Sequence, residues 1–336
     1  RSGEHVSAFL APIIFVSTVL THLGGGSAGR EGAALQMGGS LGSTLGRLLH
    51  LNQNDLKIIT VCGMSATFCG LFGTPLTAAF FVLEVIDVGV FNYSALVACL
   101  TSSFTAFFMM RAFKIPPMFL NIVGAPQEYS LFPMASVIIL AVGCAAVSIL
   151  WCIACEKTTP FLKKTFVNPY LRVAVSGITI IILTFIMGTN DYNGSGMRLA
   201  QKAVGGEKIF VLAFLIKILF TVITLGGGFR GGEIVPTLTI GAAFGSAAAP
   251  FLGLNSGFSA AVGMIAVFCG SVNCPVSSIM LGAEIFGSEK LLYFAAAAAV
   301  SYMISGRYSL YSSQKLVFSK LSPVPFDEEA PLSPLK

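Results

Sequence analysis

The stretch GMSATFCGLFGTPLTAAFFVLEVI, residues 63–86, recurs in altered form at residues 263–286 as GMIAVFCGSVNCPVSSIMLGAEIF. The two copies align without a gap. The identical positions are Gly63/Gly263, Met64/Met264, Ala66/Ala266, Phe68/Phe268, Cys69/Cys269, Gly70/Gly270, Pro75/Pro275 and Glu84/Glu284. Shared apolar composition explains a few such matches, but not glycine, cysteine, proline and glutamate together. The chain is therefore predicted to contain two copies of one design.

A second pair of segments repeats in the same order. GGGSAGREGAALQMGGSLGS at residues 24–43 corresponds to GGGFRGGEIVPTLTIGAAFGS at residues 226–246. Each reads as a glycine-rich turn followed by an apolar helix, over 33–47 and 236–250. We place the first repeat at residues 1–128, the second at 129–318 and a polar, proline-rich C-terminal tail at 319–336.

The composition is that of a membrane protein. Hydrophobic residues make up 55% of the chain and charged residues 10%, with a mean hydropathy of +0.83, whereas soluble domains carry about 25% charged residues. Apolar runs near the length of a spanning helix cover residues 58–86, 94–112, 131–155, 171–188, 208–227, 234–252, 258–286 and 291–305. We predict an all-α, polytopic integral membrane protein with two inverted-topology repeats and discontinuous helices.

The charges indicate orientation in the membrane more than a partner. The net charge is +5, but the basic residues between 157 and 172 gather in one loop, which indicates a cytoplasmic loop. No nucleic-acid partner, cofactor or metal site is predicted. Cys152 and Cys155 form a CxxC pattern inside an apolar run, where small core residues are the better interpretation.

The two copies differ in length. The second begins near Leu131 and reaches its glycine turn at Gly226, whereas only residues 1–23 precede Gly24. If the halves are equivalent, about 70 residues of the first half are missing from this chain. We expect the native gene to encode further helices ahead of Arg1, although a fragment that does not transport is an alternative.

Duplicated halves interrupted by glycine and proline are typical of secondary transporters, whose substrate site lies between the repeats near the bilayer midplane. Helix N-termini carry unpaired N–H groups and a partial positive charge, so they favour anions. Two such ends converging from the two halves would form an anion site without a basic side chain.

Arg30 and Glu31 stand among the glycines of the first turn. An ionisable residue within the membrane is by default a candidate functional residue, because its charge is expensive there. The alternative is that the pair marks a loop at the water interface.

These segments resemble the CLC family of anion channels and proton-coupled anion transporters. GREGA at 29–33 resembles the family's GREGP motif, and GGEIVP at 231–236 resembles GxFxP. The segments 73–85 and 273–285 resemble the paired helices at the family's dimer interface. SLYSSQ at 309–314 resembles the segment with the central tyrosine, here Tyr311.

The resemblance implies roles for individual residues. Glu31 would be the gating glutamate, which occupies an anion site when ionised and swings away when protonated. Arg30 would mainly support the loop and its electrostatic potential. The residues implied in anion binding are Gly29, Arg30, Gly32, Ala33, Gly232, Glu233, Ile234, Val235, Pro236 and Tyr311. The resemblance also implies a homodimer through 73–86 and 273–286, in a cell membrane and most simply a bacterial inner membrane.

Several positions depart from the usual family pattern. Ala33 replaces proline, Glu233 and Ile234 replace the usual apolar–Phe pair, and Val85 stands where chloride–proton antiporters have a second glutamate. Together these features resemble the bacterial fluoride–proton antiporter branch. A chloride channel or chloride–proton antiporter of the same family is the alternative. An enzyme is not predicted, since the sequence has no HExxH and its three histidines are scattered.

Overall fold

The computed structural model describes residues 7–311, 313–320 and 322–331, and it is largely helical. Its α-helices are α1 (Leu10–Leu23), α2 (Glu31–Leu48), α3 (Gln53–Phe72), α4 (Pro75–Glu84), α5 (Leu96–Ala112), α6 (Leu131–Thr165), α7 (Pro169–Met187), α8 (Met197–Val204), α9 (Ala213–Gly227), α10 (Ile234–Leu252), α11 (Ser256–Val272), α12 (Pro275–Phe286) and α13 (Leu291–Ile304). Short 3₁₀ turns η1 (Tyr93–Ala95) and η2 (Ser288–Lys290) precede α5 and α13.

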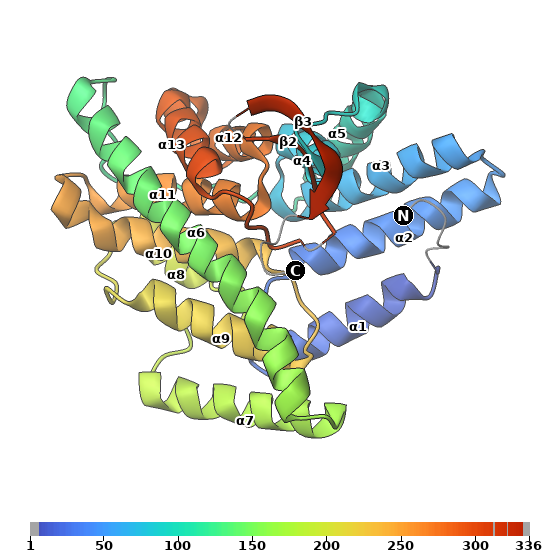
Figure 1. Ribbon diagram of the computed structural model, residues 1–336, viewed down its shortest axis with the longest axis horizontal. Coiled ribbons are helices and arrows are strands. Elements are labelled where there is room, and N and C mark those ends of the chain that lie inside the picture. Colours follow the sequence, from blue (N-terminus) through green and yellow to red (C-terminus); the bar gives the residue numbers. More distant parts are fainter. Residues whose placement is uncertain (1–6, 312, 321, 332–336) are drawn as a thin grey trace.

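Two helix pairs, α2–α3 and α10–α11, lie on opposite sides of the molecule and converge at its centre (Figure 1). Each pair packs through glycines that face each other. A methyl group added at Gly38 or Gly63 would overlap the other residue's carbonyl oxygen, and the same holds for Gly241 and Gly263. Close backbone approach through small residues is how helices pack without a hydrophobic driving force in lipid. The Gly63/Gly263 identity is therefore explained by packing.

The segments that join α3 to α4 and α11 to α12 follow the same local rules in both halves. Gly73 and Asn273 end α3 and α11 in the left-handed conformation, with φ of 72° and 58°. Pro75 and Pro275 then occupy the first position of the next helix, where no N–H partner is needed. The repeat therefore encodes the same helix–break–helix unit twice.

Each of the short helices α4 and α12 carries, in its last turn, a glutamate that caps the other helix. Glu284 accepts hydrogen bonds from Leu76 N at 2.9 Å, Thr77 N at 2.8 Å and Thr77 Oγ1 at 2.7 Å. Glu84 accepts from Val276 N at 3.0 Å, from Ser277 N at 2.9 Å and from the Ser277 hydroxyl. Each carboxylate thus satisfies the free N–H groups at a helix N-terminus of the opposite half.

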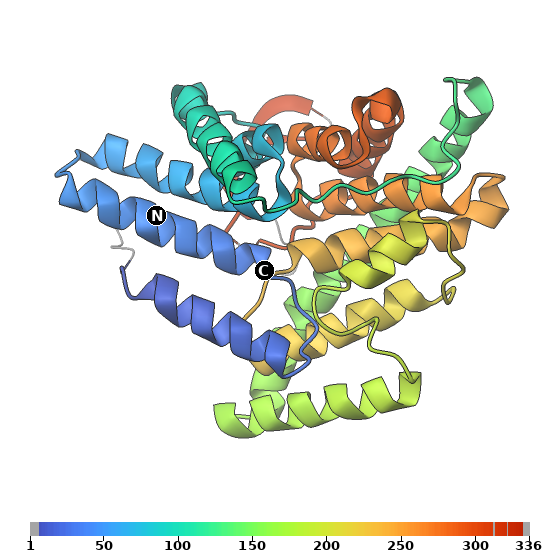
Figure 2. The same cartoon turned by 180° about the vertical axis from the view of Figure 1, so that it is seen from behind.

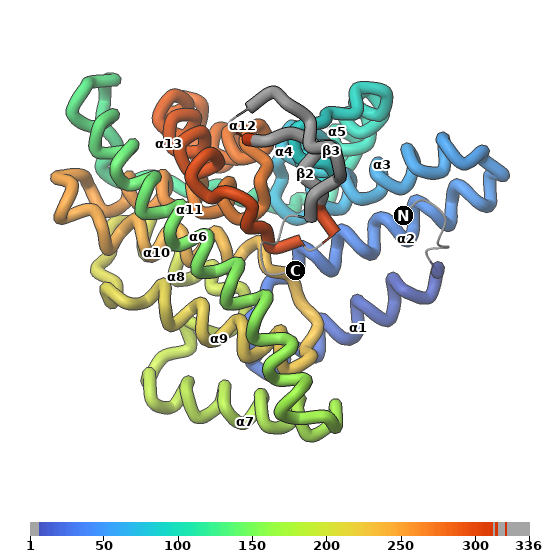
Figure 3. The backbone as a smooth tube through the Cα atoms, in the orientation of Figure 1, coloured from blue at the N-terminus to red at the C-terminus, as the bar shows by residue number. Residues whose placement is uncertain are grey.

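In the part of the chain that the structure describes, five helical segments are long and apolar enough to cross a membrane: Gln53–Phe72, Tyr93–Ala112, Leu131–Thr165, Pro169–Met187 and Ile234–Leu252. The longest, α6, runs obliquely along the second half (Figure 3). Residues 113–130 lead from α5 to α6 across the back of the molecule (Figure 2). There Met118 N donates to Phe72 O at 2.8 Å and Leu120 N to Ile285 O at 3.2 Å, which ties the linker to both halves.

The predicted helical membrane fold is confirmed, with one small addition. Strands β1 (Asp87–Val88), β2 (Lys315–Ser319) and β3 (Ser322–Pro331) form a three-stranded sheet in that order, parallel between β1 and β2 and antiparallel between β2 and β3. Part of the predicted polar tail, 319–336, is therefore strand, since its main-chain groups pair with β2. Residues 321 and 332–336 lie outside the described residues.

Candidate functional site

The two glycine-rich turns meet at the centre of the molecule in a two-residue bridge. Gly29 N donates to Gly232 O at 2.8 Å, and Gly232 N donates to Gly29 O at 2.7 Å. A methyl group at Gly232 would lie 2.6 Å from Gly32 N. Only glycine allows the backbones of the two repeats to approach this closely.

The bridge brings together the N-termini of α2 and α10. Glu31 is the first residue of α2, and Ile234 is the first residue of α10. Gly29 also lies against the Pro236 ring, since a methyl group at Gly29 would be 3.0 Å from Pro236 Cδ. Two positive helix ends, one from each half, are therefore adjacent, as predicted from the duplicated turns.

The Glu31 carboxylate lies at this junction. The residue is 3% exposed, and its Oε2 has no hydrogen-bond partner among the described residues. The backbone N–H groups of Arg30, Glu31 and Val235 stabilise its negative charge. A buried carboxylate oxygen without a partner is unusual. The surroundings favour an anion there, but they do not lock this side chain in place.

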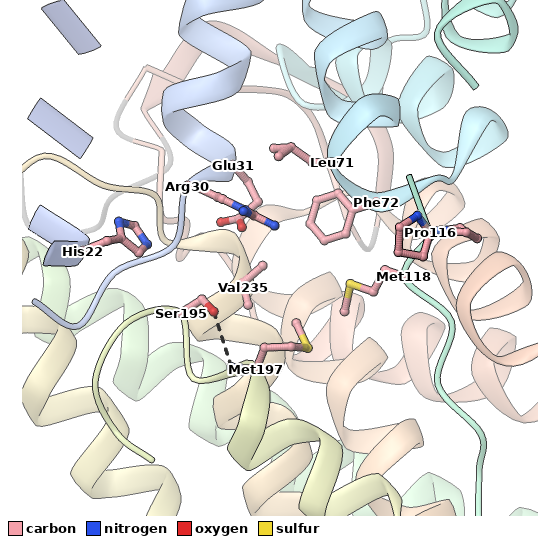
Figure 4. Close-up of a pocket in the computed structure, with 11 residues that line it drawn as sticks. His22, Arg30, Glu31, Leu71, Phe72, Pro116, Met118, Ser195, Met197 and Val235 are labelled. Atoms are coloured by element: carbon pink, nitrogen blue, oxygen red, sulfur yellow. Dashed lines mark hydrogen bonds between the residues drawn. The ribbon is translucent and has the colours of Figure 1, made fainter. Parts of the chain in front are cut away.

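A cavity of about 380 Å³ opens from Glu31 toward the back of the fold. Figure 4 shows Arg30 and Glu31 near its centre, with His22 on one side and Phe72 on the other. The lining residues are His22, Arg30, Glu31, Leu71, Phe72, Pro116, Pro117, Met118, Ser195, Met197 and Val235. The Arg30 side chain is exposed, whereas Glu31 is buried. The buried Glu31 side chain thus lines a cavity that it shares with the exposed Arg30.

Glu233 stands immediately before α10, and its negative charge interacts unfavourably with that of Glu31. Its carbonyl oxygen accepts hydrogen bonds from Thr237 N at 2.9 Å and from Thr237 Oγ1 at 2.7 Å. The buried Trp151 indole donates to the same hydroxyl at 2.8 Å. The start of α10 is therefore held by α6 through Trp151. A second acidic side chain, Glu233, lies near Glu31.

Tyr311 belongs to a short segment after α13 that is held by the amide side chains of Asn273 and Gln314 and by the backbone hydrogen bond from Leu310 N to Ser271 O. Gln314 Nε2 donates to Val85 O and to Val272 O, each at 2.9 Å, and Gln314 is 2% exposed. Tyr311 O accepts from Gln314 N at 3.1 Å. The Tyr311 phenol packs against the main core and is close enough to Glu233 and Glu31 to interact with their charges.

The structure thus gathers most of the predicted residues at one point. The bridge is formed by Gly29 and Gly232, and beside it lie Glu31, Gly32 and Val235. Behind it, in the first turns of the two helices, Ala33, Ile234 and Pro236 are buried. The sequence analysis did not identify Lys217, a fully buried lysine of α9 that hydrogen-bonds to Ser27 in the first turn. Its signal was a cation in the middle of the apolar run 208–227, whose other lysine, Lys208, stands at the edge of the run.

Comparison with known proteins agrees with this geometry. The sequence model of the voltage-gated chloride channel family matches residues 1–306. The chain is 34% identical to a protein of Pseudomonas syringae pv. tomato named "Chloride/fluoride channel protein", over 97% of this chain and 73% of that protein. It is 25% identical to an H⁺/Cl⁻ exchange transporter of Vibrio parahaemolyticus, over 79% of this chain and 59% of the transporter.

Solved structures share the fold. A CLC-type fluoride/proton antiporter superposes with a TM-score of 0.86 at 32% identity, over 90% of this chain and 76% of the antiporter. A slow cyanobacterial Cl⁻/H⁺ antiporter superposes with a TM-score of 0.75 at 21% identity, over 88% and 72%. With two interlocked repeats, paired helix N-termini and this family match, the chain belongs to the voltage-gated chloride channel (CLC) family of multi-pass membrane proteins and is a CLC-type anion transporter.

Proposed function

We propose that this protein exchanges fluoride for protons across a bacterial inner membrane, with Glu31 as the gating and coupling residue. The observation that carries the proposal is the Glu31 carboxylate, which is buried between two helix N-termini with one oxygen that has no partner in the described part of the chain. An anion and this carboxylate would compete for the same N–H groups. Protonation removes the negative charge, so the side chain no longer needs those groups and can leave them to the anion.

The transport cycle follows from that competition. A proton reaches Glu31 through the cavity lined by Arg30 and His22, and the neutral side chain vacates the junction. The anion then enters, held by N–H groups of both repeats. Loss of the proton returns the carboxylate and expels the anion. No step requires a full ion pair with a basic side chain, which would hold the anion too tightly for rapid release.

We favour fluoride over chloride as the proposed substrate for two reasons. The relatives at 34% and 32% identity are named for chloride and fluoride and for fluoride and protons, respectively. Val85 and Glu233 also depart from the chloride–proton pattern. Chloride is the second candidate, since more distant relatives are named as H⁺/Cl⁻ exchange transporters. Efflux of each salt from liposomes, followed with ion-selective electrodes, distinguishes them, because chloride efflux as fast as fluoride efflux would favour chloride.

Glu31→Gln tests the gating role. Glutamine keeps the shape and hydrogen-bonding capacity of the side chain but cannot titrate, so proton uptake driven by a fluoride gradient should be abolished. Fluoride movement would stop or become passive. The protein is expressed from its complete reading frame and reconstituted in liposomes, with Glu289→Gln, an exposed glutamate of η2, as control. Normal coupled uptake by Glu31→Gln would show that the proton takes another route.

We further propose that the protein is a homodimer with one pathway per subunit. Segments 73–86 and 273–286 carry a symmetric pair of exposed apolar side chains, Leu76 at 37% and Val276 at 40% exposure. Such a surface suits contact with a second copy in the membrane. Photobleaching of single labelled molecules in bilayers should give two steps, and single steps throughout would exclude the dimer.

A further inference from the structure

Lys217 lies in α9 behind the turn that carries Glu31, and its side chain is fully buried. Its Nζ is 2.8 Å from Ser27 Oγ, 3.0 Å from Tyr192 O and 2.8 Å from Gly194 O. Ser27 belongs to the first glycine-rich turn, whereas Tyr192 and Gly194 belong to the loop between α7 and α8. This one nitrogen therefore joins the two halves next to the proposed anion site.

The directions of the neighbouring hydrogen bonds fix the protonation state of Lys217. The Thr221 hydroxyl donates to the carbonyl oxygen of Lys217 at 2.8 Å. Its oxygen must therefore accept the 3.0 Å hydrogen bond that it shares with the Ser27 hydroxyl. Ser27 has then used its only hydrogen, so Ser27 Oγ accepts from Lys217.

The other two partners of Lys217 are carbonyl oxygens, which can only accept. Lys217 must therefore donate three hydrogen bonds at once. A neutral amine has two hydrogens and an ammonium has three. The network thus requires the charged form, and all three of its hydrogens go to uncharged oxygens.

A buried charge without a carboxylate partner is expensive. Within the described residues the Lys217 ammonium is held by dipoles alone, so its field is not cancelled by its own hydrogen-bond partners. The charge that senses this field is Glu31, whose carboxylate interacts favourably with it. An anion that replaced the carboxylate at the junction would experience the same attraction.

We propose that Lys217 is a fixed positive charge behind the anion pathway, which positions the Glu31 turn and stabilises whichever anion, substrate or carboxylate, occupies the junction. The inference rests on the proposed function and deepens it. Other titratable groups near Glu31 or on helices packed against α9 include Arg30, His22, Glu233, Tyr311, Cys155, Arg172, Cys152, Glu156, Lys157, Lys163 and Lys164.

Lys217→Gln and Lys217→Arg test the charge separately from the contacts. Glutamine keeps two donors but loses the charge, whereas arginine keeps the charge. Without the positive field, Glu31 retains its proton to higher pH, so the midpoint of the pH–rate profile should rise in Lys217→Gln. A unit charge acting over about 10 Å at an effective dielectric constant of about 20 changes an equilibrium roughly tenfold, equivalent to about one pH unit.

The assay is anion-driven proton uptake into liposomes at a series of pH values. Lys202→Gln is the matched control, since it removes an equal charge from a partly exposed lysine that pairs with Asp191 at 2.6 Å. The midpoint should stay at the wild-type value in Lys202→Gln and Lys217→Arg. An unchanged midpoint in folded Lys217→Gln would overturn the proposal and leave Lys217 as a structural tie only.

Ser27→Asp serves if neither Lys217 variant folds. It places a carboxylate against the ammonium and cancels the field of the lysine without removing the lysine. The midpoint should therefore move in the same direction as in Lys217→Gln, and an unmoved midpoint would refute the role.

The wild-type protein in the same assay tests the proposed function independently. If the wild type moves chloride and not fluoride, the fluoride assignment fails, whereas the shift between variant and wild type still tests Lys217 with the anion that is moved.

Discussion

Replacing either capping glutamate by glutamine should destabilise the fold without abolishing transport coupling. Glu84 and Glu284 each accept three hydrogen bonds at a helix N-terminus of the opposite half. Glutamine keeps one oxygen, but its NH₂ group would face N–H donors. Each substitution therefore removes the negative charge and leaves one or two donors unpaired.

The size of the effect follows from the contacts. A hydrogen bond to a charged group contributes about 1.5–3 kcal/mol, and a partly buried charge at a helix end contributes up to about 2 kcal/mol. Because some bonding survives in glutamine, we expect Glu84→Gln to lower the free energy of unfolding by about 2–4 kcal/mol. Glu284→Gln should lower it by about half as much, since Glu284 is less buried than Glu84 and water can partly replace the lost contacts.

The chain provides its own probe for this measurement. Trp151 is the single tryptophan, fully buried and hydrogen-bonded to Thr237, so its fluorescence should report unfolding in denaturant and detergent micelles. Glu289→Gln is the control, since that side chain is exposed. An effect of Glu84→Gln below about 0.5 kcal/mol would mean that the carboxyl group is held neutral and that the charged-cap reasoning is wrong. Lost proton coupling with normal stability would move Glu84 into the transport pathway.

Three further outcomes follow from the structure. Gly232→Ala places a methyl group 2.6 Å from Gly32 N, so it should abolish anion efflux from liposomes, and normal efflux would contradict the close approach. Gln314→Ala removes the hydrogen bonds that this side chain donates to Val85 O and Val272 O and should cost about 1–3 kcal/mol in the same fluorescence assay; no loss would show that the segment is held otherwise. Burial lowers the pKa of Lys320 from 10.5 to about 8. The unfolded chain therefore binds a proton that the folded protein has released between these values, so the free energy of unfolding should rise with pH across that window, and Lys320→Met should remove this slope.

The repeat predicted much of the fold because identical residues have the same local structural role in both halves. Pro75 and Pro275 start the short helices, and Gly63 and Gly263 let the long ones approach. The sheet was missed because strand pairing depends on partners far apart in the chain. Asp87 pairs with Lys315, and neither segment alone has a strong strand pattern.

The site was predictable where one local segment carries the chemistry. Glu31 stands out as a carboxylate in a glycine turn, and the structure buries it at the expected helix end. Lys217 was overlooked because its partners, Ser27 and the carbonyl groups of the loop after α7, come from two segments that are distant in the sequence from each other. Only the folded arrangement reveals that all its hydrogens are used, and hence that it is charged.

The bridge between Gly29 and Gly232 also bears on how such a chain can diverge. When GGGSAGRE at 24–31 is aligned with GGGFRGGE at 226–233, Gly29 corresponds to Gly231 and Gly232 to Arg30, so the two sides of the bridge come from different positions of the repeat. After duplication and fusion the two codons mutate separately, yet each is constrained by the backbone that the other encodes. Substitutions at the two positions should therefore arise in pairs among descendants, with the second one accommodating the first.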